Sequence, residues 1–236
     1  MRTQHRTGAA LGALFIALAG FAAPFPLSGT SGSLAPEAIE AALEEARQND
    51  VDVSLQNAIL YKGLMLFQDE EYAEAIPFLE EALRMDPALT AGLEALGWAY
   101  IRTERPERGY ALWEYFATLM PDHWMPYNLL AQAAVMKQDW NQADAMFRKA
   151  LEIKPDLYDQ RYWFGQNLLR LGKIDEGEQV FRDLIAIEPG RLDIQIDLAN
   201  VITYQFEYEE ATKIWRHINE ELPGNPGFMM NQAELE

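Results

Sequence analysis

The stretch WMPYNLLAQAAVMKQDWNQADAMFRKALEIKPDL, residues 124–157, contains the features that decide the fold. Its last proline belongs to a series that recurs at Pro87, Pro121, Pro155, Pro189 and Pro223, at intervals of 34 residues without insertion or deletion. A fixed period of this size is the sequence signature of a solenoid, in which equivalent units stack side by side. The sequence therefore predicts a repeat architecture.

The period divides most of the chain into five repeats of equal length, which span residues 56–89, 90–123, 124–157, 158–191 and 192–225. Within a repeat, two segments carry apolar residues at helical spacing, as in Leu93, Leu96 and Tyr100. The proline follows the second segment, where a residue that cannot continue a helix ends it. Each repeat is thus predicted to form a pair of antiparallel helices, and the fold class is all-α.

Two positions of every repeat hold only alanine or glycine, and we predict that they are packing sites. The eighth position holds Gly63, Gly97, Ala131, Gly165 and Ala199, and the twentieth holds Ala75, Gly109, Ala143, Gly177 and Ala211. The twenty-fourth position is instead large, with Leu79, Trp113, Phe147, Phe181 and Trp215. Helices that pack about 8–10 Å apart leave no room for two large side chains at their nearest approach. We expect each large side chain to fill the space beside a small residue.

These patterns resemble the tetratricopeptide repeat (TPR) family over residues 56–225. The fragments Leu96-Gly97-x-x-Tyr100, Ala143-x-x-x-Phe147 and Ala150-x-x-x-x-Pro155 are close to the signature of that family. The resemblance implies a right-handed superhelical solenoid. It also implies that the first helix of each repeat lines a concave groove.

The segments that flank the repeats are interpreted separately. Residues 35–55 are predicted to contain an N-terminal capping helix, because Pro36 and nearby acids suit a helix start, with Ala41 at the small packing position. Residues 226–236 are interpreted as the start of a sixth repeat or a short C-terminal cap. So short a piece would cover Phe228 and Met229 poorly, so either a partner covers this end or the chain is a fragment of a longer protein.

The first 23 residues are typical of a secretory signal peptide. Arg2 and Arg6 precede an uncharged stretch, residues 9–25, and small residues gather near its end. An uncleaved membrane anchor is the alternative, because this stretch lies at the lower limit for spanning a bilayer. Residues 24–34 would then form a flexible tether. We expect an exported, periplasmic protein, or one anchored to the inner membrane by residues 9–25.

Composition and motifs argue against several classes of function. The 236 residues include 37 acidic and 19 basic ones, a formal charge of −18, and no cysteine. The negative charge disfavours nucleic-acid binding, and the lack of cysteine excludes disulfides and thiolate metal sites. His5, His123 and His217 do not lie at metal-ligand spacing, and no phosphate loop, nucleophile elbow or dinucleotide fingerprint is present. We expect no catalysis, no metal and no cofactor.

Two further groups of residues are given structural interpretations. Acidic pairs such as Glu80-Glu81 are interpreted as solvated helix faces. The six tryptophans, Trp163 among them, are interpreted mostly as packing between helices.

The resemblance places positions 2, 5, 9, 12 and 13 of each repeat on the groove. The candidate partner-binding residues are Phe67, Trp98, Arg102, Asn128, Gln132, Tyr162, Gln166, Arg170, Asn200 and Tyr204. Gln132, Gln166 and Asn200 share position 9, and such a ladder of amides could pair with the backbone of an extended peptide. The aromatic residues could anchor hydrophobic side chains. The alternative is that the polar groove residues are simply solvated.

The charge of the predicted groove is small. It holds Glu94, Asp159 and Asp193 against Arg102 and Arg170, which leaves a net charge of about −1. Most of the negative charge is therefore expected elsewhere, where it favours solubility over a dedicated basic ligand. Two arginines do not supply the clamp with which some chaperone-binding TPR domains hold a peptide C-terminus.

The sequence favours a non-catalytic interaction scaffold that binds an extended peptide or a partner subunit in the groove. By resemblance to exported TPR proteins, we expect it to act in a bacterial envelope complex, with membrane contact only through an uncleaved N-terminal segment. Two alternatives stay open. One is a purely structural subunit of a membrane-associated complex, and the other is a glycan-binding component of polysaccharide export, because aromatic faces beside amides also suit sugar rings.

Overall fold

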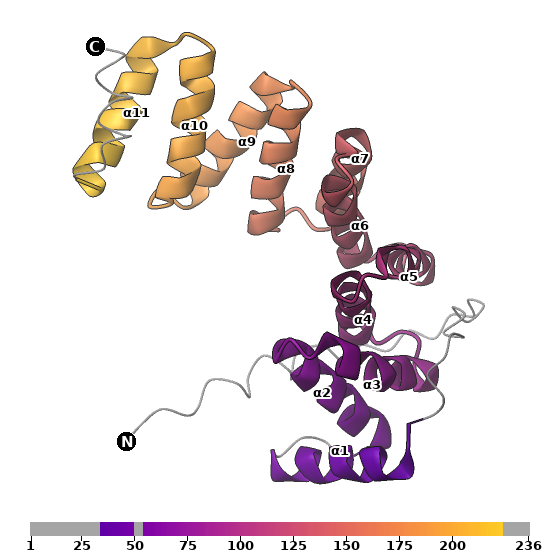
Figure 1. The fold of residues 1–236 in the computed structure, drawn as a ribbon. Helices are drawn as coiled ribbons and strands as arrows, with labels where there is room; N and C mark the ends of the chain where they lie inside the picture. Colours follow the sequence, from indigo (N-terminus) through magenta and orange to yellow (C-terminus); the bar gives the residue numbers. More distant parts are fainter. Residues whose placement is uncertain (1–33, 50–53, 224–236) are drawn as a thin grey trace, which may run out of the picture. The chain divides into compact units, whose positions relative to one another are not determined.

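A computed structural model describes residues 34–49 and 54–223, and these residues form eleven helices and no strand (Figure 1). The helices are α1 (Pro36–Gln48), α2 (Leu55–Gln68), α3 (Tyr72–Met85), α4 (Thr90–Arg102), α5 (Pro106–Leu119), α6 (Trp124–Met136), α7 (Trp140–Ile153), α8 (Tyr158–Arg170), α9 (Ile174–Ile187), α10 (Leu192–Tyr204) and α11 (Tyr208–Glu221). The predicted all-α solenoid of antiparallel helix pairs is confirmed. The predicted leader, residues 1–23, and terminal segment, residues 226–236, lie outside the described residues.

The chain divides into two compact units, each with its own packed helices. Unit 1 is Met1–Pro121 and contains α1 to α5, and unit 2 is Asp122–Glu236 and contains α6 to α11. Within each unit, successive helices pack against one another, as Figure 1 shows. We call α2 and α4 of unit 1, and α6, α8 and α10 of unit 2, the first-helix layer. Their partners α3 and α5, and α7, α9 and α11, form the second-helix layer.

The turn inside each helix pair has the same backbone conformation five times. Glu70, Glu104, Gln138, Gly172 and Phe206 follow one another at intervals of 34 residues, and all have positive φ, between 58° and 73°. In each turn the next residue donates a backbone hydrogen bond to a carbonyl five residues earlier, for example from Arg105 N to Tyr100 O at 2.8 Å. This is the left-handed C-terminal cap that ends many helices. Four of the five residues are not glycine, so these turns are strained.

The small and large positions meet in the core of each unit. All ten of the small residues are buried, and so are the five large ones. An added Cβ at Gly97 would lie 2.1 Å from Trp113 Nε1, and one at Gly165 would lie 2.7 Å from Phe181 Cε1. These glycines therefore leave space that the facing aromatic ring occupies. The close approach of the helices depends on that space.

One acidic pair is not a solvated face. Glu80 is 1% exposed, accepts a hydrogen bond from the Tyr100 hydroxyl, and lies 3.6 Å from an Arg108 guanidinium nitrogen. The guanidinium also lies over the Tyr100 ring, 4.4 Å from its centroid. The interpretation of Glu80 was wrong because its solvation depends on Tyr100 of the following repeat, which reaches back and covers it.

The capping helix α1 also packs differently from its prediction. Ala41 is exposed, whereas Ala42 and Ala46 are completely buried. α1 packs on α2, and an ion pair of 2.7 Å joins Glu45 to Lys62 of α2. The small side of α1 is thus shifted by one residue from the position that the repeat frame predicts.

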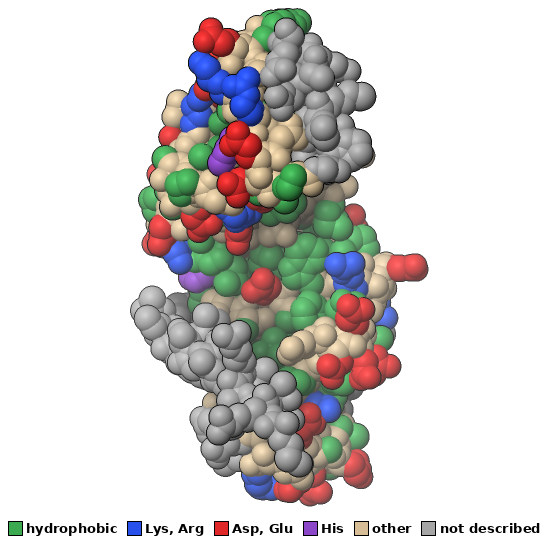
Figure 2. Space-filling view, turned by 90° about the vertical axis from the view of Figure 1, so that its left-hand side faces the viewer, with side chains coloured by type: hydrophobic (Ala, Val, Ile, Leu, Met, Phe, Trp, Pro, Cys, Tyr) green, Lys and Arg blue, Asp and Glu red, His purple; other side chains and the backbone are tan. Residues whose placement is uncertain are grey.

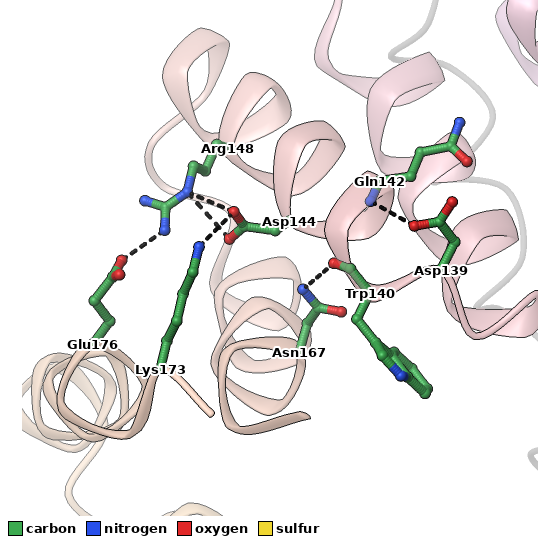
Figure 3. A network of polar contacts seen from close by, with 8 residues as sticks. All are labelled: Asp139, Trp140, Gln142, Asp144, Arg148, Asn167, Lys173 and Glu176. Atoms are coloured by element: carbon green, nitrogen blue, oxygen red, sulfur yellow. Dashed lines mark hydrogen bonds and ion pairs between the residues drawn. The ribbon is translucent and has the colours of Figure 1, made fainter. Parts of the chain in front are cut away.

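Ion pairs connect neighbouring helices of the second-helix layer in unit 2 (Figure 3). Arg148 of α7 bonds Asp144 one turn earlier at 3.1 Å and Glu176 of α9 at 2.6 Å. Lys173 adds a contact to Asp144 at 2.9 Å. Burial alone would raise the pKa of Asp144, but the hydrogen bonds from Lys173 and Arg148 outweigh it and lower the pKa. Asp144 and Glu176 are therefore compensated by cations.

No helix within 34–49 and 54–223 has both the length and the apolar character needed to cross a membrane.

Candidate partner-binding face

The polar centre of the first-helix layer in unit 2 lies between α8 and α10. The Tyr162 hydroxyl donates to Asp197 Oδ2 at 2.9 Å, and Gln166 Nε2 donates to the same oxygen at 2.6 Å. Gln166 Nε2 also lies 3.2 Å from the Tyr162 hydroxyl. All three side chains are partly buried. We call these three residues the Asp197 site.

Asp197 carries its charge in an unfavourable environment. Burial raises the pKa of its carboxyl group, and the negative charge of Asp193 raises it further, while the hydrogen bonds from Tyr162 and Gln166 act in the opposite direction. Within the described part of the chain, no lysine or arginine forms an ion pair with Asp197. Asp197 thus differs from Asp144 of the second-helix layer, which two cations compensate.

The sequence did not single out Asp197, although a signal was present. It occupies position 6 of its repeat, where the other four repeats have Tyr61, Ala95, Leu129 and Trp163. The structure shows that position 6 faces position 5 of the preceding repeat, because Asp197 bonds Tyr162. Asp197 is the one acid at a position that is uncharged in the other repeats, and this position contacts the preceding repeat. That difference was the signal available in the sequence.

The predicted amide ladder is not uniform. Gln132 is partly buried and Asn200 is exposed, but the amide nitrogen of Gln166 is already engaged by Asp197 and Tyr162. The prediction for Asn128 is wrong, because its side chain is only 6% exposed and cannot reach a ligand. α6 buries residues around most of its circumference, among them Pro126, Leu129, Ala131, Ala133 and Ala134.

Two aromatic residues of unit 2 are available on the surface of the first-helix layer. Tyr204 is 71% exposed, and Trp163 is 56% exposed. Trp163 is thus an exception to the packing role that was expected of most tryptophans, because more than half of its surface is exposed. Its ring contacts Tyr162 edge-on, with centroids 5.2 Å apart, so it lies beside a member of the Asp197 site.

A third exposed aromatic residue lies in the α10–α11 turn. Phe206 is 75% exposed and has φ 65°, and its ring contacts Tyr208 at 6.0 Å. A bulky residue in this conformation is uncommon.

The two arginines of the predicted groove differ in their surroundings. Arg102 and Arg170 are exposed, and Arg170 lies over the Trp140 ring, 5.9 Å from its centroid. Asp193 is bound by Arg191 in a bidentate ion pair, at 2.8 and 2.7 Å. On the face that Figure 2 shows, acidic side chains are spread over the surface and basic side chains lie beside several of them. The net charge counted from sequence therefore does not describe the local charge at Asp197.

In unit 1 the first-helix layer offers a partly buried aromatic surface. Phe67 packs edge-on against Tyr72, with centroids 5.3 Å apart, and Trp98 packs in the same way against Trp113 at 5.0 Å. Glu94 lies one turn before Trp98 on α4, and burial raises the pKa of its carboxyl group. The side chains of Phe67, Glu94 and Trp98 are thus partly packed in the core and partly exposed to solvent.

The chemistry of these faces suits binding. The described residues contain no group of three or more histidine or acidic side chains placed to hold a metal ion. The side chains of the first-helix layer include hydrogen-bond donors and acceptors, the partly buried carboxylate of Asp197 in unit 2, and exposed aromatic rings. Together these groups can hold a partner without reacting with it.

Comparisons with known proteins agree with the repeat architecture. The model of the tetratricopeptide repeat family matches residues 60–89 and 126–157. Among curated proteins, no sequence matches this chain.

Several solved structures share the fold. MamA (AMB-1) is 25% identical with a TM-score of 0.59, over 69% of this chain and 96% of that one. YrrB, described as a TPR protein with an unusual peptide-binding site, is 18% identical with a TM-score of 0.63, over 83% and 99%. A tetratricopeptide repeat protein from Parabacteroides merdae is 16% identical with a TM-score of 0.64, over 83% and 72%.

Proteins with this fold are generally non-catalytic interaction modules. The period of 34 residues and the stacked helix pairs agree with the tetratricopeptide repeat match at residues 60–89 and 126–157, and the described helices share the fold of these solved repeat structures.

Proposed function

We propose that this chain is a non-catalytic scaffold that binds an extended segment of a partner protein along the first-helix layer of unit 2. The observation that carries the proposal is the Asp197 site with the exposed Trp163 beside it. A polar centre next to an accessible aromatic ring can fix both the backbone and a side chain of a bound segment. YrrB, which shares the fold, is described as having a peptide-binding site.

An array of overlapping peptides from envelope proteins, probed with the full chain, tests this proposal. We expect a subset of extended peptides to bind, and Trp163→Ala to weaken that binding at least fivefold, because an exposed aromatic anchor contributes about 1 kcal/mol or more. Ile187→Ala is the matched control, since Ile187 is also an exposed large apolar residue but belongs to α9 of the second-helix layer. Equal effects of the two variants, or no peptide binding, would contradict the proposal.

We also propose that the protein works outside the cytoplasm, within an envelope complex. The support is the composition of residues 1–25, with Arg2 and Arg6 before an uncharged stretch. Fractionation of cells that express the full chain with a C-terminal tag should place it in the periplasm or on the inner membrane. The mass of the isolated protein then distinguishes a cleaved leader from a retained anchor. Recovery in the cytoplasm alone would overturn this part.

A glycan ligand is the alternative that the exposed Trp163 beside Tyr162 also suits, because aromatic rings stack on sugars. A shift of tryptophan fluorescence with an oligosaccharide, lost in Trp163→Ala, would favour it over a peptide.

A further inference from the structure

Among the residues that the structure describes, only neutral donors hold the carboxylate of Asp197. Tyr162 and Gln166 both donate to Oδ2, so one oxygen takes both hydrogen bonds and the side chain has a fixed orientation. Neither donor carries a charge. The negative charge therefore sits on a partly buried group that only dipoles stabilise, an arrangement that costs free energy relative to water.

Several other acids of unit 2 are instead paired with cations. Asp144 is bonded by Arg148 and Lys173, and Glu210 is bonded by Arg182 at 2.7 Å. Even Asp193, one turn before Asp197 on α10, is held by Arg191. Asp197 is instead flanked by that like charge, and no cation of the described residues pairs with it. The charge that would complete the site is positive and is not supplied by this part of the chain.

We propose that Asp197 binds a lysine or arginine side chain of the extended segment that occupies the first-helix layer of unit 2. An ammonium or guanidinium group that donates to the carboxylate forms a charge-assisted hydrogen bond and compensates the buried charge. The exposed Trp163 ring, which contacts Tyr162, offers an apolar surface for the aliphatic stem of such a residue. This inference rests on the proposed function and specifies the chemistry of the partner.

The inference reverses an expectation from sequence. The net charge of the predicted groove, about −1, favoured solubility over a basic ligand. The acids and bases do not cancel locally, because Arg191 is engaged by Asp193 while no cation among residues 34–49 and 54–223 pairs with Asp197. Recognition of a basic residue depends on the local charge at Asp197.

The test uses peptides that bind the full chain on the array. Each basic peptide is synthesised with its lysine or arginine intact and with that residue replaced by glutamine, and both are titrated against three proteins. These are the wild type, Asp197→Asn and Asp183→Asn. Asparagine can still accept from Tyr162 and Gln166, so the first variant removes the charge and keeps the hydrogen bonds. Asp183 of α9 is exposed on the second-helix layer, also accepts from a glutamine amide, and provides the same charge change away from the proposed binding surface.

We expect the array to select basic peptides, and Asp197→Asn to weaken the intact peptide about tenfold, the lower range for a charge-assisted hydrogen bond at a partly exposed site. In Asp197→Asn the affinity for the glutamine peptide should fall less than about twofold, and Asp183→Asn should change the affinity for neither peptide by more than about twofold.

If Asp197→Asn lowers the affinity for the intact and the glutamine peptide equally, the inference is overturned. An array that shows no preference for basic residues would overturn it as well. Both results would leave the proposed function in place. If no peptide binds, the proposed function fails and the inference fails with it.

Discussion

Because Trp113 packs directly against Gly97, we predict that the single methyl group added by Gly97→Ala destabilises the protein. In Gly97→Ala the new Cβ would lie 2.1 Å from Nε1, 2.4 Å from Cε2 and 2.9 Å from Cδ1 of the indole. Unstrained contacts between such atoms are about 3.5–4.0 Å, so the ring must move by more than about 1 Å. Trp113 is completely buried, and its indole nitrogen donates to Leu93 O at 3.3 Å. The ring therefore has no free space to move into.

The magnitude follows from three contributions. Overpacking of a core costs about 1–3 kcal/mol, and displacement of the indole from Leu93 O costs about 1 kcal/mol more. Alanine in place of glycine inside a helix recovers about 1 kcal/mol. We expect Gly97→Ala to lower the free energy of unfolding by about 1–3 kcal/mol. In unit 2, Trp215 shares a core with Ala199, but its indole nitrogen reaches Thr203 Oγ1 at 3.4 Å. The equivalent residue in unit 1 is Ile101, which offers no such acceptor.

The assay is urea unfolding of the full chain, with amide hydrogen exchange to locate the loss in α4 and α5. Gly92→Ala is the control on the same helix, because its new Cβ meets leucine side chains that can shift, with Leu83 Cδ2 at 3.2 Å and Leu60 Cδ1 at 3.4 Å. It should stay within about 1 kcal/mol of the wild type. Trp113→Phe should reduce the loss of stability that Gly97→Ala causes, with a coupling free energy of about 1–2 kcal/mol between the two sites. Equal stability of Gly97→Ala and Gly92→Ala would refute the packing.

Three further predictions concern polar groups. Tyr100→Phe removes the donor to buried Glu80 and should lower the free energy of unfolding by about 2–3 kcal/mol, with faster hydrogen exchange in unit 1 as the check. Asp144→Asn should cost about 1 kcal/mol at pH 7 in urea unfolding. Because folding lowers the pKa of Asp144, that difference should persist above an unfolded pKa of about 3.9 and vanish as the pH falls through the folded value. Asp197→Asn should leave stability at pH 7 unchanged or higher, within about 1 kcal/mol, because folding raises the pKa of Asp197 and its charge opposes folding above that pKa. A clear loss of stability in Asp197→Asn would show that the carboxylate serves the fold.

Much of the architecture could be predicted from the sequence, because each of the five repeats carries the same pattern. The spacing of prolines sets the helix pairs, and the alternation of small and large residues sets how they pack, as Gly97 and Trp113 show. The five turns with positive φ could not be predicted from residue type. Four of them use glutamate, glutamine or phenylalanine, and only Gly172 is a glycine. The helices on both sides impose the conformation, so the local sequence does not have to encode it.

The candidate site was predicted in part. The groove positions of the family led to Tyr162 and Gln166, which the structure brings together. They did not lead to Asp197, because the groove positions are defined within a single repeat. Asp197 instead accepts a hydrogen bond from Tyr162 of the preceding repeat. The errors at Asn128 and Glu80 have the same origin, because exposure is decided by what the surrounding helices cover.

The central claim is that the first-helix layer is the surface that binds the partner. Photo-crosslinking in living cells tests it most directly, with a photoreactive phenylalanine analogue at Trp163 in one full-length variant and at Lys149 in another. Both residues are exposed, and Lys149 belongs to α7 of the second-helix layer. The account predicts a specific adduct at position 163 that maps to one extended segment near a lysine or arginine, and none at position 149. Adducts only at position 149, or none at either position, would contradict it.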